Sequence, residues 1–170
     1  AVTELIIALD AIETLVAVDV TSQLPDDVVL PDVGYHRRLS AEGLLALSPT
    51  KVIGSDEMGP NTTLAQLRSA GIDVEVVNTE ANVEGLVTRI DQIATIMHRK
   101  ERATALKNQV KKQVEALKGN QPTTGDKKKV LFLLIHEGRA ANVAGSETTP
   151  DAIIQLSLIH ISEPTRLQQI

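Results

Sequence analysis

The sequence predicts an α/β fold in which a parallel sheet is covered by helices on both faces. Three observations support this prediction: short apolar strands alternate with helical segments over residues 1–82, a long amphipathic stretch follows at 83–118, and a new apolar strand begins near Lys129. Short strands without polar alternation, separated by helices, are typical of buried parallel sheets. We therefore predict a first α/β lobe in 1–82, a helical connection in 83–118 and the start of a second lobe in 119–155.

Local sequence chemistry places the elements of the first lobe. Ser40 can cap a helix that carries Glu42 in its first turn, and Gly71 can end a helix in the left-handed conformation. In chain order, the predicted elements are a helix at 2–9, a buried strand at 15–20, a helix at 41–47, a strand at 51–54, a helix at 62–70 and a strand at 73–77.

An apolar stripe at helical spacing runs through residues 83–118. Its members are Leu86, Ile90, Ile93, Met97, Leu106, Val110, Val114 and Leu117. The stripe predicts either one long helix or a kinked pair. A continuous helix would be about 50 Å long, which is more than one small domain needs, so it can join two lobes.

The second lobe begins with the apolar run "KVLFLLI" at 129–135, which predicts a buried strand, followed by a loop and a short helix near 150–156. The next stretch, "LSLIHISEPTR" from Leu156 to Arg166, matches the translation of a common sequencing adapter at all eleven residues. An edge strand followed by a turn is the alternative interpretation. We favour the adapter, expect 156–170 to be non-native, and exclude this tail from fold reasoning.

Composition narrows the functional classes. The 170 residues carry a net charge of −5 and contain no Cys, no Trp, one Tyr and one Phe. An acidic chain lacks the clustered positive charge of a nucleic-acid-binding surface, and the absence of cysteine excludes disulfides and thiolate metal sites. The core must therefore be aliphatic, and we expect no nucleic-acid partner.

The segment "VGYHRRLSAEGLLALSPTKVIGSDEMGP" follows a pattern close to VGYxRxLSAEGxLxLxPxxVIxSxxxGP. Together with "LRSAGIDV" and "VAGSETTPDAII", it resembles the haem-binding periplasmic proteins of bacterial haem ABC importers, within the group that also carries siderophores and cobalamin. The resemblance runs from Val2 to about Gln155. It implies two Rossmann-like lobes bridged by one long helix (the class III periplasmic binding-protein fold), ligand in the cleft between them, a first strand missing from lobe one and an incomplete second lobe.

The only tyrosine lies in this segment. Phenolate is a known axial ligand of haem iron, but a phenol with a pKa near 10 needs a metal or a nearby cation to lose its proton. The resemblance assigns iron ligation to Tyr35, with Arg37 hydrogen-bonding to it or to a haem propionate. Arg38 is a propionate contact or a solvated charge. His36 is interpreted as a bystander rather than a competing ligand.

Other family roles fall on residues outside the tyrosine loop. The resemblance suggests His136 as a second axial ligand and Glu42 as a docking residue for the permease. A loop histidine without metal and a helix-start glutamate remain the alternatives. The loop 55–61 is expected to flank the ligand.

The resemblance implies a monomeric, non-enzymatic periplasmic protein that captures ferric haem and delivers it to a membrane permease. A siderophore or cobalamin carrier of the same fold is the first alternative. A nucleotide-binding Rossmann-type enzyme domain is the second, but neither GxGxxG nor GxxxxGK[ST] occurs in the sequence.

Overall fold

The computed structural model describes residues 2–119, 130–135, 138 and 140–156. Two units are distinguished, one formed by 1–79 with 86–107 and the other by 80–85 with 108–170. The predicted residue His136 and the predicted tail from 157 onward lie outside the described residues. Within the described part of the chain, no helix combines the length and apolarity needed to cross a membrane.

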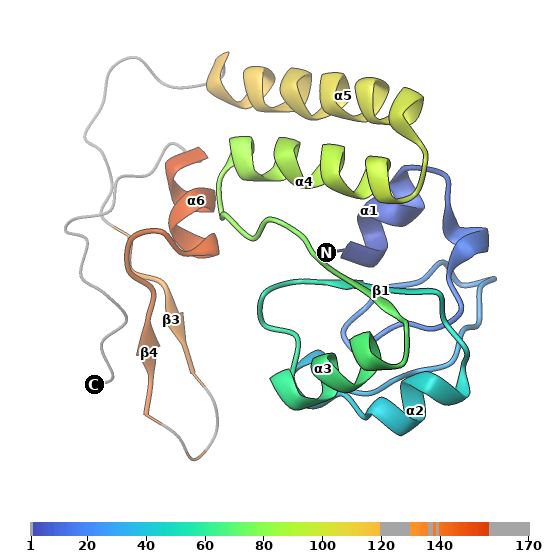
Figure 1. Ribbon diagram of the computed structural model, residues 1–170. Coiled ribbons are helices and arrows are strands. Elements are labelled where there is room, and N and C mark those ends of the chain that lie inside the picture. Colours follow the sequence, from blue (N-terminus) through green and yellow to red (C-terminus); the bar gives the residue numbers. More distant parts are fainter. Residues whose placement is uncertain (1, 120–129, 136–137, 139, 157–170) are drawn as a thin grey trace. The chain divides into compact units, whose positions relative to one another are not determined.

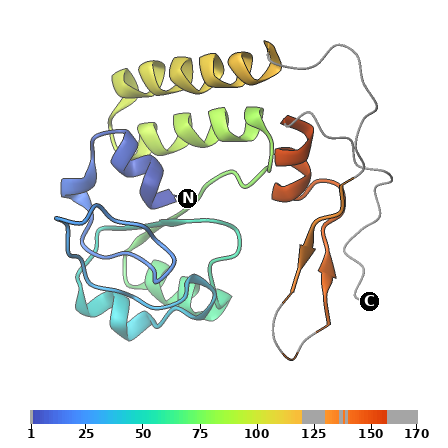
Figure 2. The same cartoon turned by 180° about the vertical axis from the view of Figure 1, so that it is seen from behind.

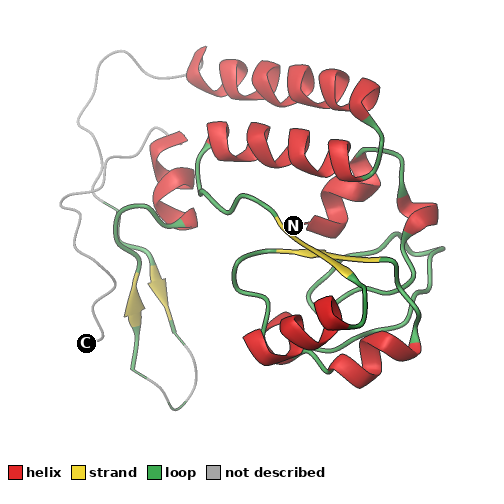
Figure 3. Ribbon diagram, viewed as in Figure 1, coloured by secondary structure: helices red, strands yellow, loops and turns green. Residues whose placement is uncertain are grey.

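A pair of parallel strands forms the centre of the first unit. Strand β1 (Lys51–Gly54) pairs with β2 (Asp73–Val76), and Lys51 lies opposite Asp73. Helices α2 (Ala41–Ala46) and α3 (Asn61–Ser69) lie on one side of this sheet, and α1 (Val2–Ala8) and α4 (Val83–Ile96) lie on the other (Figures 1 and 3). The two strands predicted at 51–54 and 73–77 are thus confirmed to within one residue, with helices on both faces.

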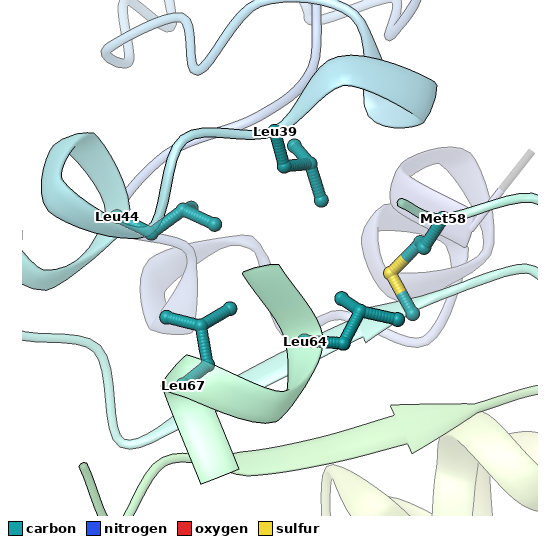
Figure 4. Close-up of a cluster of buried hydrophobic side chains, with 5 residues drawn as sticks. All are labelled: Leu39, Leu44, Met58, Leu64 and Leu67. Carbon is teal, nitrogen blue, oxygen red and sulfur yellow. The ribbon is translucent and has the colours of Figure 1, made fainter. Parts of the chain in front are cut away.

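The core between the sheet and helices α2 and α3 is aliphatic, as the composition predicted. Its five buried side chains converge in Figure 4; they are Leu39, Leu44, Met58, Leu64 and Leu67. Both predicted helix ends are confirmed here. Ser40 Oγ accepts a hydrogen bond from the Gly43 N–H at 3.2 Å, and Gly71 has a φ of 84° directly after α3.

The segment predicted as one long helix or a kinked pair forms two helices, so the continuous alternative is wrong. Helix α4 ends at Ile96, His98 adopts a φ of 56°, and α5 (Lys100–Gly119) runs back alongside α4 (Figures 1 and 2). Lys107 Nζ donates to Asp91 Oδ1 across the pair at 2.5 Å. The physical reason is burial: folding back buries the Ala103 side chain, which is only 2% exposed.

The buried strand predicted at 15–20 is also corrected. A 3₁₀ turn at Ile12–Thr14 comes first, and the following residues make only an isolated parallel bridge, between Val18 and Asp32. The Val16 and Val20 side chains are 51% and 59% exposed. Among the described residues, this segment has a backbone partner on one edge only, and this pairing does not bury its apolar side chains.

The second unit contains a short hairpin and a helix. Strand β3 (Leu133–Leu134) pairs antiparallel with β4 (Asn142–Val143), and α6 (Thr149–Leu156) confirms the helix predicted near 150–156. The prediction of a buried strand at 129–135 is wrong for its described part, because side chains 131–135 are 42–70% exposed. An antiparallel partner needs only a short connection, so the following segment pairs with β3.

Candidate ligand-binding site

A glycine turn presents the single tyrosine on the surface of the first unit. Gly34 has a φ of 81°, and its N–H donates to Asp32 Oδ1 at 2.6 Å. Its carbonyl accepts a hydrogen bond from the Val20 N–H at 3.1 Å. Tyr35 follows directly, with 42% of its side chain exposed. Tyr35 is therefore accessible from solvent, and its role as a ligand stays a prediction.

Backbone hydrogen bonds join the tyrosine loop to the loop that follows β1. The Gly59 N–H donates to the His36 carbonyl at 3.0 Å, and the Leu39 N–H donates to the Gly59 carbonyl at 2.8 Å. Thr63 Oγ1 also donates to the Leu39 carbonyl at 3.1 Å. Leu39 is only 7% exposed. These contacts fix the 3₁₀ turn His36–Arg38 on the core and place the loop 55–61 beside the tyrosine loop.

The polar side chains form a continuous row. The Tyr35 and His36 rings lie 4.5 Å apart at 55°, His36 Nε2 lies 3.8 Å from Glu57 Oε2, and Arg37 Nη2 donates to Glu57 Oε1. The pKa of the Arg37 guanidinium is raised, chiefly by its hydrogen bond to Glu57. The negative charge of Glu57 and the electrostatic interaction with Tyr35 contribute smaller increases. Arg37 therefore remains cationic at every physiological pH.

Sequence reasoning did not identify Glu57 as the partner of Arg37. The resemblance placed the 55–61 loop beside the ligand but gave no partner to its carboxylates. Opposite charge was the signal in the sequence that could have indicated this pair. An arginine was expected at the edge of the site, and the loop expected to flank the ligand contains a carboxylate. Only the backbone bonds between the two loops bring these side chains within reach of each other.

Of the remaining predicted site residues, Arg38 and Glu42 are described and His136 is not. Arg38 is exposed and makes no ion pair with any described residue. Glu42 is exposed in the first turn of α2. The structure therefore brings Tyr35 and Arg37 together, leaves Arg38 and Glu42 accessible to solvent, and does not describe His136.

These features define an α/β unit that presents an exposed loop with a tyrosine and an arginine. The chain matches the family model of the periplasmic binding proteins over residues 1–163, and it belongs to that family. The predicted class III periplasmic binding-protein fold is thereby confirmed. The family is one of binding proteins rather than a class of enzymes.

The solved structures most useful for comparison are haem-binding members of this family. The periplasmic haem-binding protein HutB of Vibrio cholerae is 57% identical, with a TM-score of 0.93, and the match covers 100% of this chain and 66% of HutB. The periplasmic haem-binding protein RhuT of Roseiflexus sp. RS-1, in its apo form, is 31% identical with a TM-score of 0.90. The match covers 99% of this chain and 66% of RhuT. The periplasmic haem-binding protein BhuT, in complex with two haems, is 33% identical with a TM-score of 0.86. The match covers 100% of this chain and 68% of BhuT.

These matches confirm the predicted resemblance to haem-binding periplasmic proteins. The chain spans about two thirds of the length of these three proteins. Comparison with curated proteins gave no match.

Proposed function

We propose that this chain is part of the haem-capturing component of a bacterial ABC importer, located in the periplasm, which passes ferric haem to a membrane permease. Similarity to solved haem-binding proteins supports this, at 57% identity to the protein from Vibrio cholerae. The observation that carries the proposal is the exposed Tyr35 phenol beside the Arg37 cation, on a loop joined to the core by hydrogen bonds.

In this proposal, Tyr35 is the axial ligand of the iron. Ferric iron is a hard Lewis acid, and a phenolate oxygen is a suitable fifth ligand for it. The neighbouring Arg37 places a positive charge that interacts electrostatically with Tyr35. His36 is not the proposed ligand, because its Nε2 lies 3.8 Å from the Glu57 Oε2 atom, and a protonated imidazole would pair with that carboxylate rather than with iron.

The arginines have the second role in the proposal. Haem carries two anionic propionates, and arginine binds carboxylates through paired hydrogen bonds. Glu57 holds Arg37 beside Tyr35, while Arg38 is exposed on the same turn. We assign propionate contacts to Arg37 and Arg38. His136 stays a proposed second axial ligand, and Glu42 a proposed permease contact on the exposed side of α2.

Titration with hemin tests the ligand assignment. The unaltered chain should give a ferric phenolate spectrum with a phenolate-to-iron charge-transfer band, and Tyr35→Phe should abolish that band because it removes only the oxygen. His36→Gln is the matched control and should keep the band. A bound-hemin spectrum without this band in the unaltered chain, or one that is unchanged in Tyr35→Phe and changed in His36→Gln, would overturn the assignment.

Affinity separates the role of the arginine from that of the tyrosine. Arg37→Ala should retain the phenolate band but weaken hemin binding by about 10- to 100-fold, since a hydrogen bond to a charged group contributes about 1.5–3 kcal/mol. Parallel titration with cobalamin and a ferric siderophore tests the alternative cargo. Binding of either of these without hemin binding would exclude the haem proposal.

A further inference from the structure

The Glu57 carboxylate contacts two consecutive side chains of the tyrosine loop, one with each of its oxygen atoms. Glu57 Oε1 accepts a hydrogen bond from Arg37 Nη2, and Glu57 Oε2 lies 3.8 Å from His36 Nε2. The His36 ring in turn lies 4.5 Å from the Tyr35 ring. A single carboxylate from a different loop therefore contacts both side chains that follow the tyrosine.

The backbone on either side of Glu57 is held in place by hydrogen bonds and by the core. The Glu57 N–H donates to Ser55 Oγ at 3.3 Å, and the Met58 N–H donates to the Ser55 carbonyl at 3.1 Å. Met58 is only 6% exposed and belongs to the core cluster. The Arg37 side chain, by contrast, is half exposed, and its guanidinium has no other hydrogen-bond acceptor among the described residues. Arg37 therefore takes its position from Glu57.

Stability alone does not account for this pair. Both side chains are 52% exposed, and an exposed ion pair contributes little to stability because solvent screens it. The bond to Glu57 engages only Nη2, yet the guanidinium is a planar fork whose N–H groups keep a fixed geometry. Fixing one nitrogen atom therefore restricts the orientation of the remaining donors, which stay available to a second carboxylate.

We propose that Glu57 is a positioning residue for cargo binding, which orders Arg37 before the ligand arrives so that the remaining N–H groups meet a carboxylate of the cargo. The inference rests on the proposed function for the identity of that carboxylate, which is a haem propionate. An arginine that became ordered only on binding would lower the affinity, because the loss of side-chain freedom opposes association. An arginine that is already ordered avoids this loss.

Charge and positioning predict opposite effects of removing Glu57. The Glu57 carboxylate is negative and repels an anionic cargo, so its neutralisation should strengthen binding if charge alone decides the affinity. If Glu57 acts by ordering Arg37, its neutralisation should weaken binding although the site becomes more positive. The direction of the change in affinity therefore distinguishes the two roles.

Hemin titration of Glu57→Gln measures this direction. We expect the affinity to fall by about two- to tenfold, the usual effect of losing the prior order of one long side chain. Asp56→Asn is the matched control, because it removes the same charge from the adjacent residue, which is exposed and forms no ion pair with any described residue. This control should bind hemin as tightly as the unaltered chain or slightly more tightly. Equal or tighter hemin binding by Glu57→Gln would overturn the proposal.

Two further titrations test whether Glu57 acts through Arg37 and through a carboxylate of the cargo. In the Arg37→Ala background, Glu57→Gln should no longer weaken hemin binding, because there is no arginine to position. The dimethyl ester of hemin has no propionate charge, and it should bind to Glu57→Gln and to the unaltered chain equally. A loss of affinity that persists in the Arg37→Ala background, or that is as large for the ester, would refute this mechanism.

Nuclear magnetic resonance tests the ordering step without any cargo. In the unaltered chain, the order parameter of the Arg37 Nε–H should exceed that of Arg38, which has no ion pair with a described residue, and Glu57→Gln should remove the difference. Circular dichroism verifies that each variant is folded. Equal order of Arg37 in the two chains would overturn the proposal whether or not hemin binds. Failure of the unaltered chain to bind hemin would contradict the proposed function, whereas Glu57-dependent order of Arg37 would still support the positioning role.

Discussion

Replacing Gly54 with alanine should destabilise the first unit, because the strand end leaves no room for a side chain. A Cβ atom at this position would lie 2.6 Å from Met58 Cγ and 3.1 Å from Met58 Cε. Met58 is 6% exposed and belongs to the core cluster with Leu64 and Leu67, so it cannot move freely into solvent. The clash has to be relieved within the core.

The expected magnitude follows from two opposing effects. Overpacking a close-packed core costs about 1–3 kcal/mol. Replacing glycine with alanine also reduces the conformational entropy of the unfolded chain, which raises the free energy of unfolding by about 0.4–1 kcal/mol. The net loss in the free energy of unfolding should be about 1–2 kcal/mol, which corresponds to a fall in Tm of about 2–8 °C for a chain of this size.

Thermal and urea unfolding followed by circular dichroism measures this loss, and a double-mutant cycle identifies its cause. Met58→Ala alone should be destabilising because it leaves a cavity, by about 2–5 kcal/mol. In the Met58→Ala background, Gly54→Ala has space and should cost little or even stabilise the protein. Strictly additive effects of the two substitutions would refute the steric explanation, since contacting residues that clash must show coupling.

Three further predictions concern local features of the first unit. Ser40→Ala should lower the free energy of unfolding by about 1 kcal/mol through loss of the α2 cap, whereas Ser40→Asp should preserve it, as urea unfolding of both variants would show. Gly71→Ala should lower the Tm because its φ of 84° disfavours a Cβ by about 1–2 kcal/mol, with Gly71→Asn less harmful; equal Tm values for the two variants would contradict this. The hydrogen bond to Asp73 raises the pKa of Lys51, so the resulting stability is present below the ordinary lysine pKa and is lost as the pH rises through the folded-state value. The urea midpoint of Lys51→Met should therefore fall less than that of the unaltered chain when the pH is raised from about 9 to about 12. Parallel pH profiles of the two urea midpoints would refute this linkage.

Elements whose structure depends on nearby residues were predicted most accurately. The Ser40 cap, the Gly71 helix end and strand β1 require only a favoured side chain or a short apolar run, and all three are confirmed. The segment 15–20 has an equally apolar sequence, but it makes only an isolated bridge. A strand is completed by its neighbours on both edges, and a single segment carries no information about those neighbours.

The same distinction applies to the helical connection. Apolar spacing correctly indicated helix on both sides of His98, and a continuous rod remained one of the two alternatives. Periodicity reports which face of a helix is apolar, but not which surface covers it. Ion pairs of Arg99 with Glu13 and of Arg102 with Asp10 hold the turn against the end of α1, and they join residues 86 and 92 positions apart.

The sequence by itself determined the chemistry of this protein: an aliphatic α/β chain, one phenol with an adjacent arginine, and motifs shared with haem-binding relatives. Tertiary structure alone decided that Glu57 pairs with Arg37 and that the connection folds back as two helices. Residue type and short-range spacing are encoded locally and can be derived from the printed chain. Which distant groups meet depends on how the whole chain buries its apolar surface, and that requires the folded structure.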